Sequence, residues 1–281
     1  MKIELIYATW PNSPNGIGWH AMADALRKGR LTATLKKAGF KTREHVVAAT
    51  GEGAGEIKAA IALAARIGAI VRASHEAGAL AVIVCGSCSV AALGAISGLG
   101  GEDTGILWMD AHPDLNTPET TMSGLFEGMA AAIVLGDAWQ ALAHETAGFS
   151  SVSRRSLCLY GARDIDPAEQ TVIDDDAIAA VSDAESAIET LEGCERLYIH
   201  LDMDVHDAAQ LRVNRYSGEG GPSPEQVRAD LVAVTQALPL AAIALTGLDP
   251  EIGKQDGAVA CAIAHIKAVC ESRAQSALLE A

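Results

Sequence analysis

The chain has 281 residues, of which 49% are hydrophobic, and it carries a formal net charge of −15 at pH 7. This length and apolar content suffice for a sizeable buried core and argue against disorder. The acidic balance argues against nucleic acids and anionic lipid surfaces as partners, because like charges repel. We therefore expect a small-molecule partner, with no nucleic acid and no membrane.

The N-terminal segment, residues 1–7, is too short and too early in charge for a secretory signal peptide and is typical of a first strand. The six cysteines are scattered along the chain, which does not indicate a disulfide framework. The resulting expectation is a cytoplasmic location.

Short apolar runs of β type alternate along the chain with longer Ala-rich helical patterns. The runs predict strands at 2–8, 79–85, 104–109, 156–161, 196–202 and 240–246. The helical patterns lie near 18–39, 56–77, 89–99, 124–146, 223–237 and 257–279. Because strands that are nearly all apolar alternate with helices, we predict an α/β fold whose parallel sheet has helices on both faces. No linker or repeat divides the chain, so residues 1–281 are expected to form a single domain.

Two stretches stand out from this alternation. Residues 77–101 carry no charge and are long enough to raise the question of a transmembrane helix. They include five glycines and three serines between 77 and 100, so a strand ending at Cys85, a turn and a helix from Ser89 explain them better. The segment 206–223 is the longest irregular stretch, and long loops in compact domains are often functional.

Acidic side chains follow two of the predicted strands, at the carboxyl ends where ligands bind in α/β folds. The two sets are Asp110, His112 and Asp114 after the strand at 104–109, and Asp202 and Asp204 after the strand at 196–202. Alternate side chains of an extended segment share a face, so each set can converge on one point. Carboxylates with one imidazole suit Mn²⁺ better than structural zinc, and bridging carboxylates would hold two ions about 3.5–4 Å apart. The alternative is that these acids only cap turns and helices.

The motifs around these acids carry a family resemblance. They are Trp108-Met109-Asp110-Ala111-His112-Pro113-Asp114-Leu115-Asn116-Thr117-Pro118 and Leu201-Asp202-Met203-Asp204-Val205-His206-Asp207. Together they resemble the two aspartate motifs of the arginase/agmatinase ureohydrolase family, and the segment from Cys85 to Gly98 is similar to the family's Gly-Gly-Asp-His-Ser segment and the helix after it. The match runs in order from about residue 80 to about residue 255.

The resemblance implies a three-layer α/β/α fold with a mostly parallel eight-stranded sheet. It also implies two Mn²⁺ ions and hydrolysis of an amidine or guanidine by a metal-bridging hydroxide. By position, the implied metal ligands are Cys88, Asp110, His112, Asp114, Asp202 and Asp204, with Asp110 and Asp202 bridging the ions.

Three positions depart from the family pattern. Cys88 stands where the family has a histidine ligand, a role that a thiolate can take. Glu127 stands where the family has a histidine that passes protons to the leaving amine. The candidate catalytic residues are Glu127 and the implied metal ligand Asp114. Gly247 replaces the glutamate that holds the substrate's guanidinium group.

Other interpretations of the departures stay open. Glu127 could be a solvated helix residue that leaves the proton-passing role vacant. Cys88 could be a buried core thiol, or Cys85 and Cys88 could form a redox pair, since their spacing fits one. A redox role would leave the acidic sets without an explanation.

The residues that the resemblance assigns to the amino-acid end of a substrate are better preserved. By position, the candidates are Asn116, Thr121 and Ser123 for the α-carboxylate, and Asp164, Asp166 and Glu169 for the α-amino group. An Asp followed by Pro is also an ordinary helix start, and both interpretations of Asp166 can hold together.

The missing carboxylate at Gly247 bears on the substrate. A guanidinium group is always cationic, and burying it without a partner is costly. A neutral guanidine avoids this cost, and N-hydroxylation lowers guanidine basicity. The departures at Cys88, Glu127 and Gly247 also resemble the hydroxyarginine-hydrolysing arginase homologues of D-cycloserine biosynthesis.

We therefore expect cleavage of Nω-hydroxy-L-arginine to hydroxyurea and L-ornithine. An ordinary ureohydrolase acting on arginine or another guanidino or formimino compound is the nearest alternative. A non-catalytic metal-binding homologue is another, because two catalytic positions differ from the family. The chain ends at Ala281, soon after the last helical pattern, so a monomer is expected and a homo-oligomer remains open.

Overall fold

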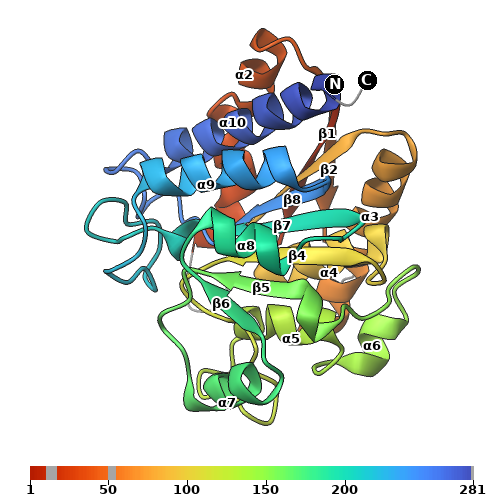
Figure 1. Ribbon diagram of the computed structural model, residues 1–281, viewed down its shortest axis with the longest axis vertical. Helices are drawn as coiled ribbons and strands as arrows, with labels where there is room; N and C mark the ends of the chain where they lie inside the picture. Colours follow the sequence, from red (N-terminus) through yellow and green to blue (C-terminus); the bar gives the residue numbers. More distant parts are fainter. Residues whose placement is uncertain (11–17, 50–54, 280–281) are drawn as a thin grey trace.

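The computed structural model describes residues 1–10, 18–49 and 55–279. They form three layers, with a central sheet between two layers of helices (Figure 1). Among these residues, no helix combines the length and the apolar character needed to cross a membrane.

The sheet has eight strands in the order β2-β1-β3-β8-β7-β4-β5-β6, and each pair of neighbours is parallel. The strands are β1 (Lys2–Thr9), β2 (Lys41–Ala48), β3 (Leu80–Cys85), β4 (Thr104–Met109), β5 (Leu157–Tyr160), β6 (Ala179–Val181), β7 (Arg196–Asp202) and β8 (Leu240–Thr246). The predicted α/β fold with a parallel eight-stranded sheet is therefore confirmed.

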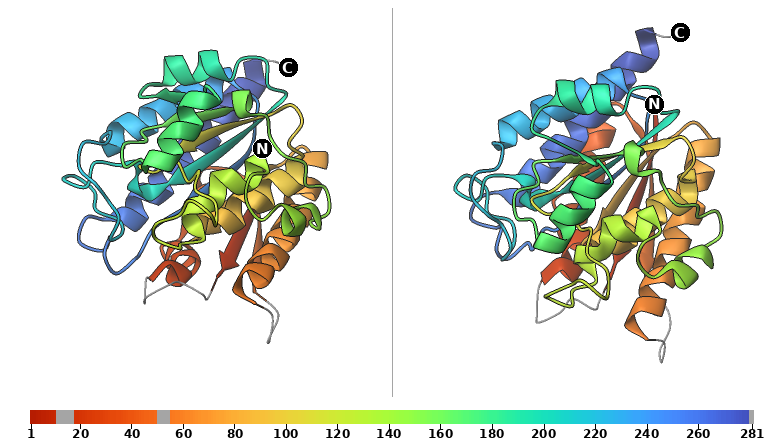
Figure 2. Two further views of the ribbon diagram at one scale, coloured as in Figure 1. Left: turned by 90° about the horizontal axis from the view of Figure 1, so that it is seen from below. Right: turned by 60° about the horizontal axis from the view of Figure 1, so that its bottom comes forward.

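Helices cover both faces of the sheet, as the apolar strands predicted. One layer holds α3 (Glu56–Glu76), α4 (Cys88–Leu99), α5 (Ala130–Leu135) and α6 (Gln140–His144). The other holds α1 (Met22–Lys28), α2 (Leu31–Lys37), α8 (Ala184–Thr190), α9 (Pro224–Ala237) and α10 (Ala258–Leu279). The left view of Figure 2 shows the sheet between these layers, with α3 to α5 in orange to yellow-green and α8 to α10 in green to blue. A further helix, α7 (Pro167–Asp175), follows β5.

Alternation of side chains along the strands divides the core into two apolar clusters, one on each face of the sheet. On β4, Ile106 and Trp108 belong to one cluster, and Leu107 and Met109 belong to the other. All residues of β3 and β4 are buried because both faces of these strands are covered.

The pattern of apolar runs missed two strands, β2 and β6, and both lie at the edges of the sheet. Most of β2 is exposed or half-buried, and β6 has only three residues, none of them buried. An edge strand contacts the core on fewer sides, so its sequence needs no continuous apolar run.

Two predicted helices are wrong in their extent. The pattern at 18–39 is a 3₁₀ turn, η2 (Gly18–Ala21), followed by α1 and α2, which are separated at Arg30 by a backbone φ of 73°. The pattern at 124–146 begins at the 3₁₀ turn η3 (Glu127–Met129) and is divided into α5 and α6 by Gly136, whose φ is 85°. A left-handed residue ends a helix, and neither site breaks the apolar periodicity of the sequence. The short helix α7 begins at Pro167 with Asp166 as its N-cap, as the Asp-Pro pair predicted, whereas the short helix α8 was not predicted.

The uncharged stretch at 77–101 is β3 followed by α4, as expected. All twelve residues of α4 are buried. Its small residues allow the backbone of α3 to approach closely, since a Cβ atom on Gly98 would lie closer than 3.0 Å to the side chain of Val71. The composition of this stretch therefore reflects close helix packing within the protein.

The fold brings four distant segments to one place. The strands β3, β8, β7 and β4 are consecutive in the middle of the sheet, although they come from residues 80–85, 240–246, 196–202 and 104–109. Because all strands are parallel, their carboxyl ends lie at the same edge, where Cys88, Gly247, Asp202 and Asp110 follow them.

Candidate metal centre and substrate pocket

A pocket of about 220 Å³ opens at this edge of the sheet. Most of the residues predicted for the site line it, namely Cys88, Asp110, His112, Asp114, Asn116, Ser123, Glu127, Asp164, Asp166, Glu169, Asp202 and Asp204. Thr121 is the one predicted site residue that is not part of its lining.

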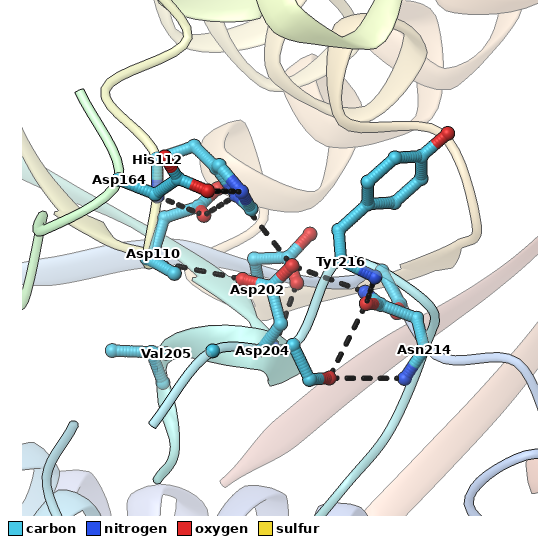
Figure 3. Close-up of polar contacts among 12 residues, drawn as sticks. Asp110, His112, Asp164, Asp202, Asp204, Val205, Asn214 and Tyr216 are labelled. Atoms are coloured by element: carbon cyan, nitrogen blue, oxygen red, sulfur yellow. Dashed lines mark hydrogen bonds and ion pairs between the residues drawn. The ribbon is translucent and has the colours of Figure 1, made fainter. Parts of the chain in front are cut away.

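One side of the pocket floor is formed by Asp110, His112 and Asp204, whose ligand atoms lie within 4.8 Å of one another (Figure 3). The Nδ1 atom of His112 is 3.2 Å from Asp110 Oδ1 and 3.5 Å from Asp204 Oδ2. The backbone N–H of His112 donates to Asp110 Oδ1, and that of Asp204 donates to Asp202 Oδ1. These bonds within each motif fix the carboxylates that the alternating pattern predicted.

A second group of ligand atoms shares Asp110 with the first and includes Cys88, Asp202 and His200 within 4.8 Å. The Cys88 thiol donates to Asp202 Oδ2 at 3.1 Å. Both ring nitrogens of His200 already have hydroxyl partners, because its Nδ1 contacts the Tyr198 hydroxyl at 2.9 Å and its Nε2 contacts Thr246 Oγ1 at 3.2 Å. Its ring also stacks on Trp108 with centroids 3.7 Å apart, so His200 is a core residue below the site.

The carboxylates of the site are crowded in a buried space. Burial raises the pKa of Asp110 to about 7, and the charge of Asp204 adds to the effect. Burial also raises the pKa values of Asp114 and Asp202, with further contributions from neighbouring carboxylates. Such a cluster accommodates its negative charge when cations lie between its members.

The neighbouring carboxylates also raise the pKa values of His112 and Cys88. Burial alone would lower the pKa of His112, but its hydrogen bond with Asp110 and the charge of Asp204 raise that pKa to about 10. Burial, with the charge of Asp202 next in size, raises the pKa of the Cys88 thiol well above its ordinary value. A cation at this position would reverse that effect and favour the thiolate.

Asp114 lines the pocket, but its ligand atoms fall outside both groups. It lies in the left-handed region, with a φ of 53°, and its carbonyl oxygen accepts hydrogen bonds from the N–H groups of Ala131 and Ala132. Its backbone therefore caps α5 while its side chain faces the pocket.

Glu127 is buried and lies beside the N-terminus of α4. Its Oε2 atom accepts a hydrogen bond from Ser87 Oγ at 2.8 Å and another from the backbone N–H of Ser89 at 3.1 Å. Burial raises the pKa of Glu127 to about 7, although these hydrogen bonds oppose the shift. Glu127 therefore braces the turn that carries Cys88 and also holds a titratable group at the pocket wall, so it is not a solvated helix residue.

Gly247, at the end of β8, has no room for a side chain. A Cβ atom there would lie closer than 3.0 Å to both carboxylate oxygens of Asp202, and the φ of Gly247 is 68°. Asp202 is held in this space by Thr246 Oγ1 and by the Cys88 thiol, each at 3.1 Å from Oδ2. The space beside Gly247, where the resemblance implies a guanidinium-binding glutamate, is thus filled by the carboxylate of Asp202, one of the predicted metal ligands.

The opposite wall holds the residues predicted for the amino-acid end of a substrate. Asn116 Nδ2 donates to Asp166 Oδ2 at 3.0 Å, so these two side chains form one unit at the pocket. Both oxygens of Glu169 accept backbone hydrogen bonds, from the N–H groups of Leu115 and Asp166. Glu169 therefore completes the capping box at the start of α7, and it also belongs to the pocket lining.

The remaining predicted residues lie at the rim. The Asp164 side chain is 81% exposed and lies 3.7 Å from His112 Nε2. Thr121 Oγ1 is 3.4 Å from Ser123 Oγ, and each accepts a backbone N–H of the same turn. Ser123 faces the pocket, whereas Thr121 supports the turn.

Five pocket residues were not predicted, namely Trp19, Leu125, Gly128, Asn214 and Tyr216. Asn214 Nδ2 donates to Asp204 Oδ2 at 3.1 Å and to the carbonyl oxygen of Gly247 at 2.7 Å, so it links two of the motifs. The rings of Trp19 and Tyr216 have centroids 5.9 Å apart and form an aromatic wall. Asn214 and Tyr216 lie in the irregular segment 206–223, whose length was the available sequence signal.

The geometry gives a redox pair at Cys85 and Cys88 no support. All six cysteines lie in the described part of the chain and all are free. Burial raises the pKa of Cys85 to about 12, and the Cys88 thiol is committed to Asp202. Reactive redox thiols have lowered pKa values and are accessible.

An α/β/α fold with a buried pocket of Asp, His and Cys side chains at the carboxyl edge of its sheet is typical of hydrolases that bind metal ions. The family model described as the arginase family matches residues 15–270. Arginase-1 of Rattus norvegicus is 28% identical over 228 residues, which cover 72% of this chain and 70% of that protein. The arginase of Bacillus subtilis is 28% identical over 138 residues, or 44% of this chain and 47% of that protein.

Solved structures agree at the level of the fold. The arginase from Bacillus cereus has a TM-score of 0.87 at 19% identity, covering 96% of this chain and 98% of that one. The formimidoylglutamase from Bacillus subtilis has a TM-score of 0.75 at 15% identity, covering 96% and 86%. The chain belongs to the arginase family, the ureohydrolases that act on C–N bonds of linear amidines, which confirms the resemblance of its motifs.

Proposed function

We propose that this protein is a dimanganese hydrolase that cleaves Nω-hydroxy-L-arginine, with one water molecule, to hydroxyurea and L-ornithine. The observation that carries the proposal is the combination at Gly247 and Asp202. The pocket gathers acidic side chains that could hold metal ions, while Gly247, at the position of the family's guanidinium-binding glutamate, has no space for a side chain. We also propose that residues 1–281 act as one catalytic domain.

The donor set fits two cations. The two groups of ligand atoms share Asp110, each lies within 4.8 Å, and crowding raises the pKa values of Asp110, Asp114 and Asp202. We assign the ions to Cys88, Asp110, Asp114 and Asp202 on one side and to Asp110, His112, Asp202 and Asp204 on the other. When bound, such ions supply Lewis acidity and lower the pKa of a coordinated water. Oxygen-rich ligands favour Mn²⁺, and one sulfur makes zinc a competitor.

The charge of the substrate follows from the wall around Gly247. An unmodified guanidinium would need a carboxylate that is free to accept its N–H groups, but the nearest one, Asp202, is already bonded to Thr246 and Cys88. Burying a cation without such a partner is costly. A hydroxyguanidine is less basic and can enter in its neutral form, which removes this cost.

We assign Glu127 a role in holding and releasing a proton at the pocket wall. Both of its hydrogen bonds to α4 end on Oε2, and its pKa is raised to about 7 by burial. A carboxyl group with a pKa near neutrality can give a proton to a leaving amine and take one back at the same pH. Its fixed position also keeps the turn with Cys88 in place.

The amino-acid end of the substrate is assigned to the opposite wall. The Asp166 carboxylate, oriented by Asn116 and braced through Glu169, can accept the N–H groups of an α-ammonium. Ser123 at the rim can donate to an α-carboxylate, and Asp164 adds a second acidic group near the entrance. The solved arginase of Entamoeba histolytica in complex with L-ornithine, at a TM-score of 0.84, is consistent with a pocket for this kind of amino acid.

The test is a direct comparison of two substrates. Manganese-loaded protein is assayed with Nω-hydroxy-L-arginine and with L-arginine, and ornithine and hydroxyurea or urea are quantified. We expect faster turnover of the hydroxylated amino acid. Faster turnover of arginine would support the ordinary ureohydrolase instead, and no turnover of several guanidino or formimino compounds at full metal occupancy would support a non-catalytic homologue.

A further inference from the structure

A second group of metal-ligating side chains lies outside the pocket lining. It consists of His206, Cys261 and His265, whose ligand atoms all lie within 4.8 Å of one another. Both imidazoles are fully buried, and Cys261 is half-buried. None of the three lines the pocket described above.

Two parts of the chain that are distant in sequence build this group. His206 follows the 3₁₀ turn η5 (Met203–Val205), which carries the pocket residue Asp204. Cys261 and His265 are one turn apart on α10, so their side chains share a face of that helix. The stacked rings of His206 and His265, with an interplanar angle of 4°, join the helix to the turn.

The tautomer of His206 is set by its surroundings. Its Nδ1 atom is 2.7 Å from the carbonyl oxygen of Met203, which can only accept, so Nδ1 carries the proton. The Nε2 atom of the neutral ring therefore presents a lone pair. A backbone carbonyl that orients an imidazole in this way is the usual outer partner of a metal-binding histidine.

A single proton satisfies the contact between the two histidines, but it leaves the Cys261 thiol without an acceptor at His265 Nε2. His265 Nε2 lies 3.0 Å from His206 Nε2 and 3.2 Å from Cys261 Sγ. If His265 Nε2 carries a proton, it can donate to His206, but then it cannot accept from the thiol. If it carries a lone pair, it can accept from the thiol, but it then faces a second lone pair on His206.

We propose that His206, Cys261 and His265 bind a Zn²⁺ ion in a site separate from the catalytic pocket. An ion among the three atoms accepts both imidazole lone pairs and the thiolate and so removes the conflict between them. Two nitrogens and one sulfur are a donor set that zinc favours over manganese. The two sites thus have different metal preferences.

The ligand atoms of His206, His265 and Cys261 are nearly as far apart as a zinc site requires. Tetrahedral zinc with bonds of about 2.0–2.1 Å to nitrogen and about 2.3 Å to sulfur needs ligand atoms roughly 3.4–3.6 Å apart. The observed separations of 3.0 Å and 3.2 Å need to widen by a few tenths of an ångström, which side-chain rotation can supply. The partial exposure of Cys261 leaves the fourth position to water. The ion would tie α10 to the turn that positions Asp204.

The test uses a Cys88→Ser background, so that no thiolate of the catalytic pocket contributes to the signal. This protein is loaded with Co²⁺, and its near-ultraviolet spectrum is compared with that of versions that also carry Cys261→Ser, His265→Gln or, as a matched control, Cys270→Ser. Cys270 is a buried cysteine of the same helix outside the group. We expect a thiolate-to-cobalt absorption band that Cys261→Ser abolishes, that His265→Gln weakens, and that Cys270→Ser leaves unchanged.

A measurement without further substitutions guards against variants that do not fold. The zinc-loaded Cys88→Ser protein is examined by X-ray absorption at the zinc edge. A sulfur neighbour at about 2.3 Å, at a coordination number averaged over all the zinc ions bound, supports the site. A shell of nitrogen and oxygen alone, or a cobalt band that survives Cys261→Ser, overturns the proposal. Both readouts are independent of catalytic activity and of the substrate.

Discussion

Substitution of Gly247 by alanine tests the link between this glycine and Asp202, which we propose as a metal ligand. The new methyl group would lie closer than 3.0 Å to both carboxylate oxygens of Asp202, so the carboxylate has to move. The backbone contributes a separate penalty, because a φ of 68° disfavours residues with a Cβ atom by about 1–2 kcal/mol.

The cost of moving Asp202 can be approximated from its contacts. Its carboxylate accepts hydrogen bonds from Thr246 Oγ1, the Cys88 thiol and the backbone N–H of Asp204. Loss of one hydrogen bond to a charged group costs about 1.5–3 kcal/mol. With the backbone penalty, the metal-free variant should lose roughly 2.5–5 kcal/mol of unfolding free energy. At about 2 °C per kcal/mol for a domain of this size, Tm should fall by at least roughly 5 °C.

The matched control is Gly193→Ala. Gly193 has a φ of 85°, but no atom lies within 4 Å of a Cβ built on it, so only the backbone penalty applies. Thermal unfolding of the two metal-free variants, followed by calorimetric titration with Mn²⁺, separates the two contributions. We expect a smaller loss of Tm for Gly193→Ala, of roughly 2–4 °C, and unchanged Mn²⁺ affinity. Equal losses of stability and equal Mn²⁺ affinity in the two variants would refute the role given to Asp202.

Three further predictions follow from the pocket. Glu127 has a pKa of about 7 when folded and about 4.5 when unfolded, so the folded state binds more protons between these values and stability falls as pH rises from about 4.5 to 7. In metal-free protein, Glu127→Gln should remove up to about 3 kcal/mol of this loss, so the variant gains stability relative to the wild type as pH rises. Chemical denaturation at pH 5 and at pH 8 measures this gain. The same difference in unfolding free energy between variant and wild type at both pH values would contradict the raised pKa of Glu127. Ser123→Ala should raise KM for the amino-acid substrate several-fold, whereas Thr121→Val, outside the pocket lining, should change KM little. Equal changes of KM in the two variants would contradict a contact of Ser123 with the substrate. Cys88→Ser should weaken zinc binding at the catalytic pocket more than manganese binding, because sulfur favours zinc, and isothermal titration with each metal distinguishes this from a uniform loss.

The agreement between sequence and structure is best at the central strands. The strands β3, β4, β7 and β8 are covered on both faces, so burial alone requires the continuous apolar runs that predicted them. The edge strands β2 and β6 have no such requirement and were missed. Helix breaks at Arg30 and Gly136 were missed because a single left-handed residue leaves the apolar periodicity intact.

The pocket divides in a similar way. Residues of short alternating motifs, such as Asp110 and His112, could be placed together because local backbone geometry sets which face they share. Asn214, Tyr216 and Trp19 reach the pocket from segments without such a motif, so only the folded chain shows that they line it. The roles assigned to the predicted ligands and substrate contacts remain proposals that the experiments above address.

The sequence by itself determined the class of fold, the family and the two aspartate motifs, because strand burial and alternation act over a few neighbouring residues. The tertiary structure decided how those motifs combine. The order β3-β8-β7-β4 brings residues from four separate segments to one edge, and there the Asp202 carboxylate occupies the space beside Gly247. The position of the Asp202 carboxylate depends on contacts with residues far away in the sequence, such as the hydrogen bond from Cys88, which is 114 positions away. No pattern of neighbouring residues encodes such a contact.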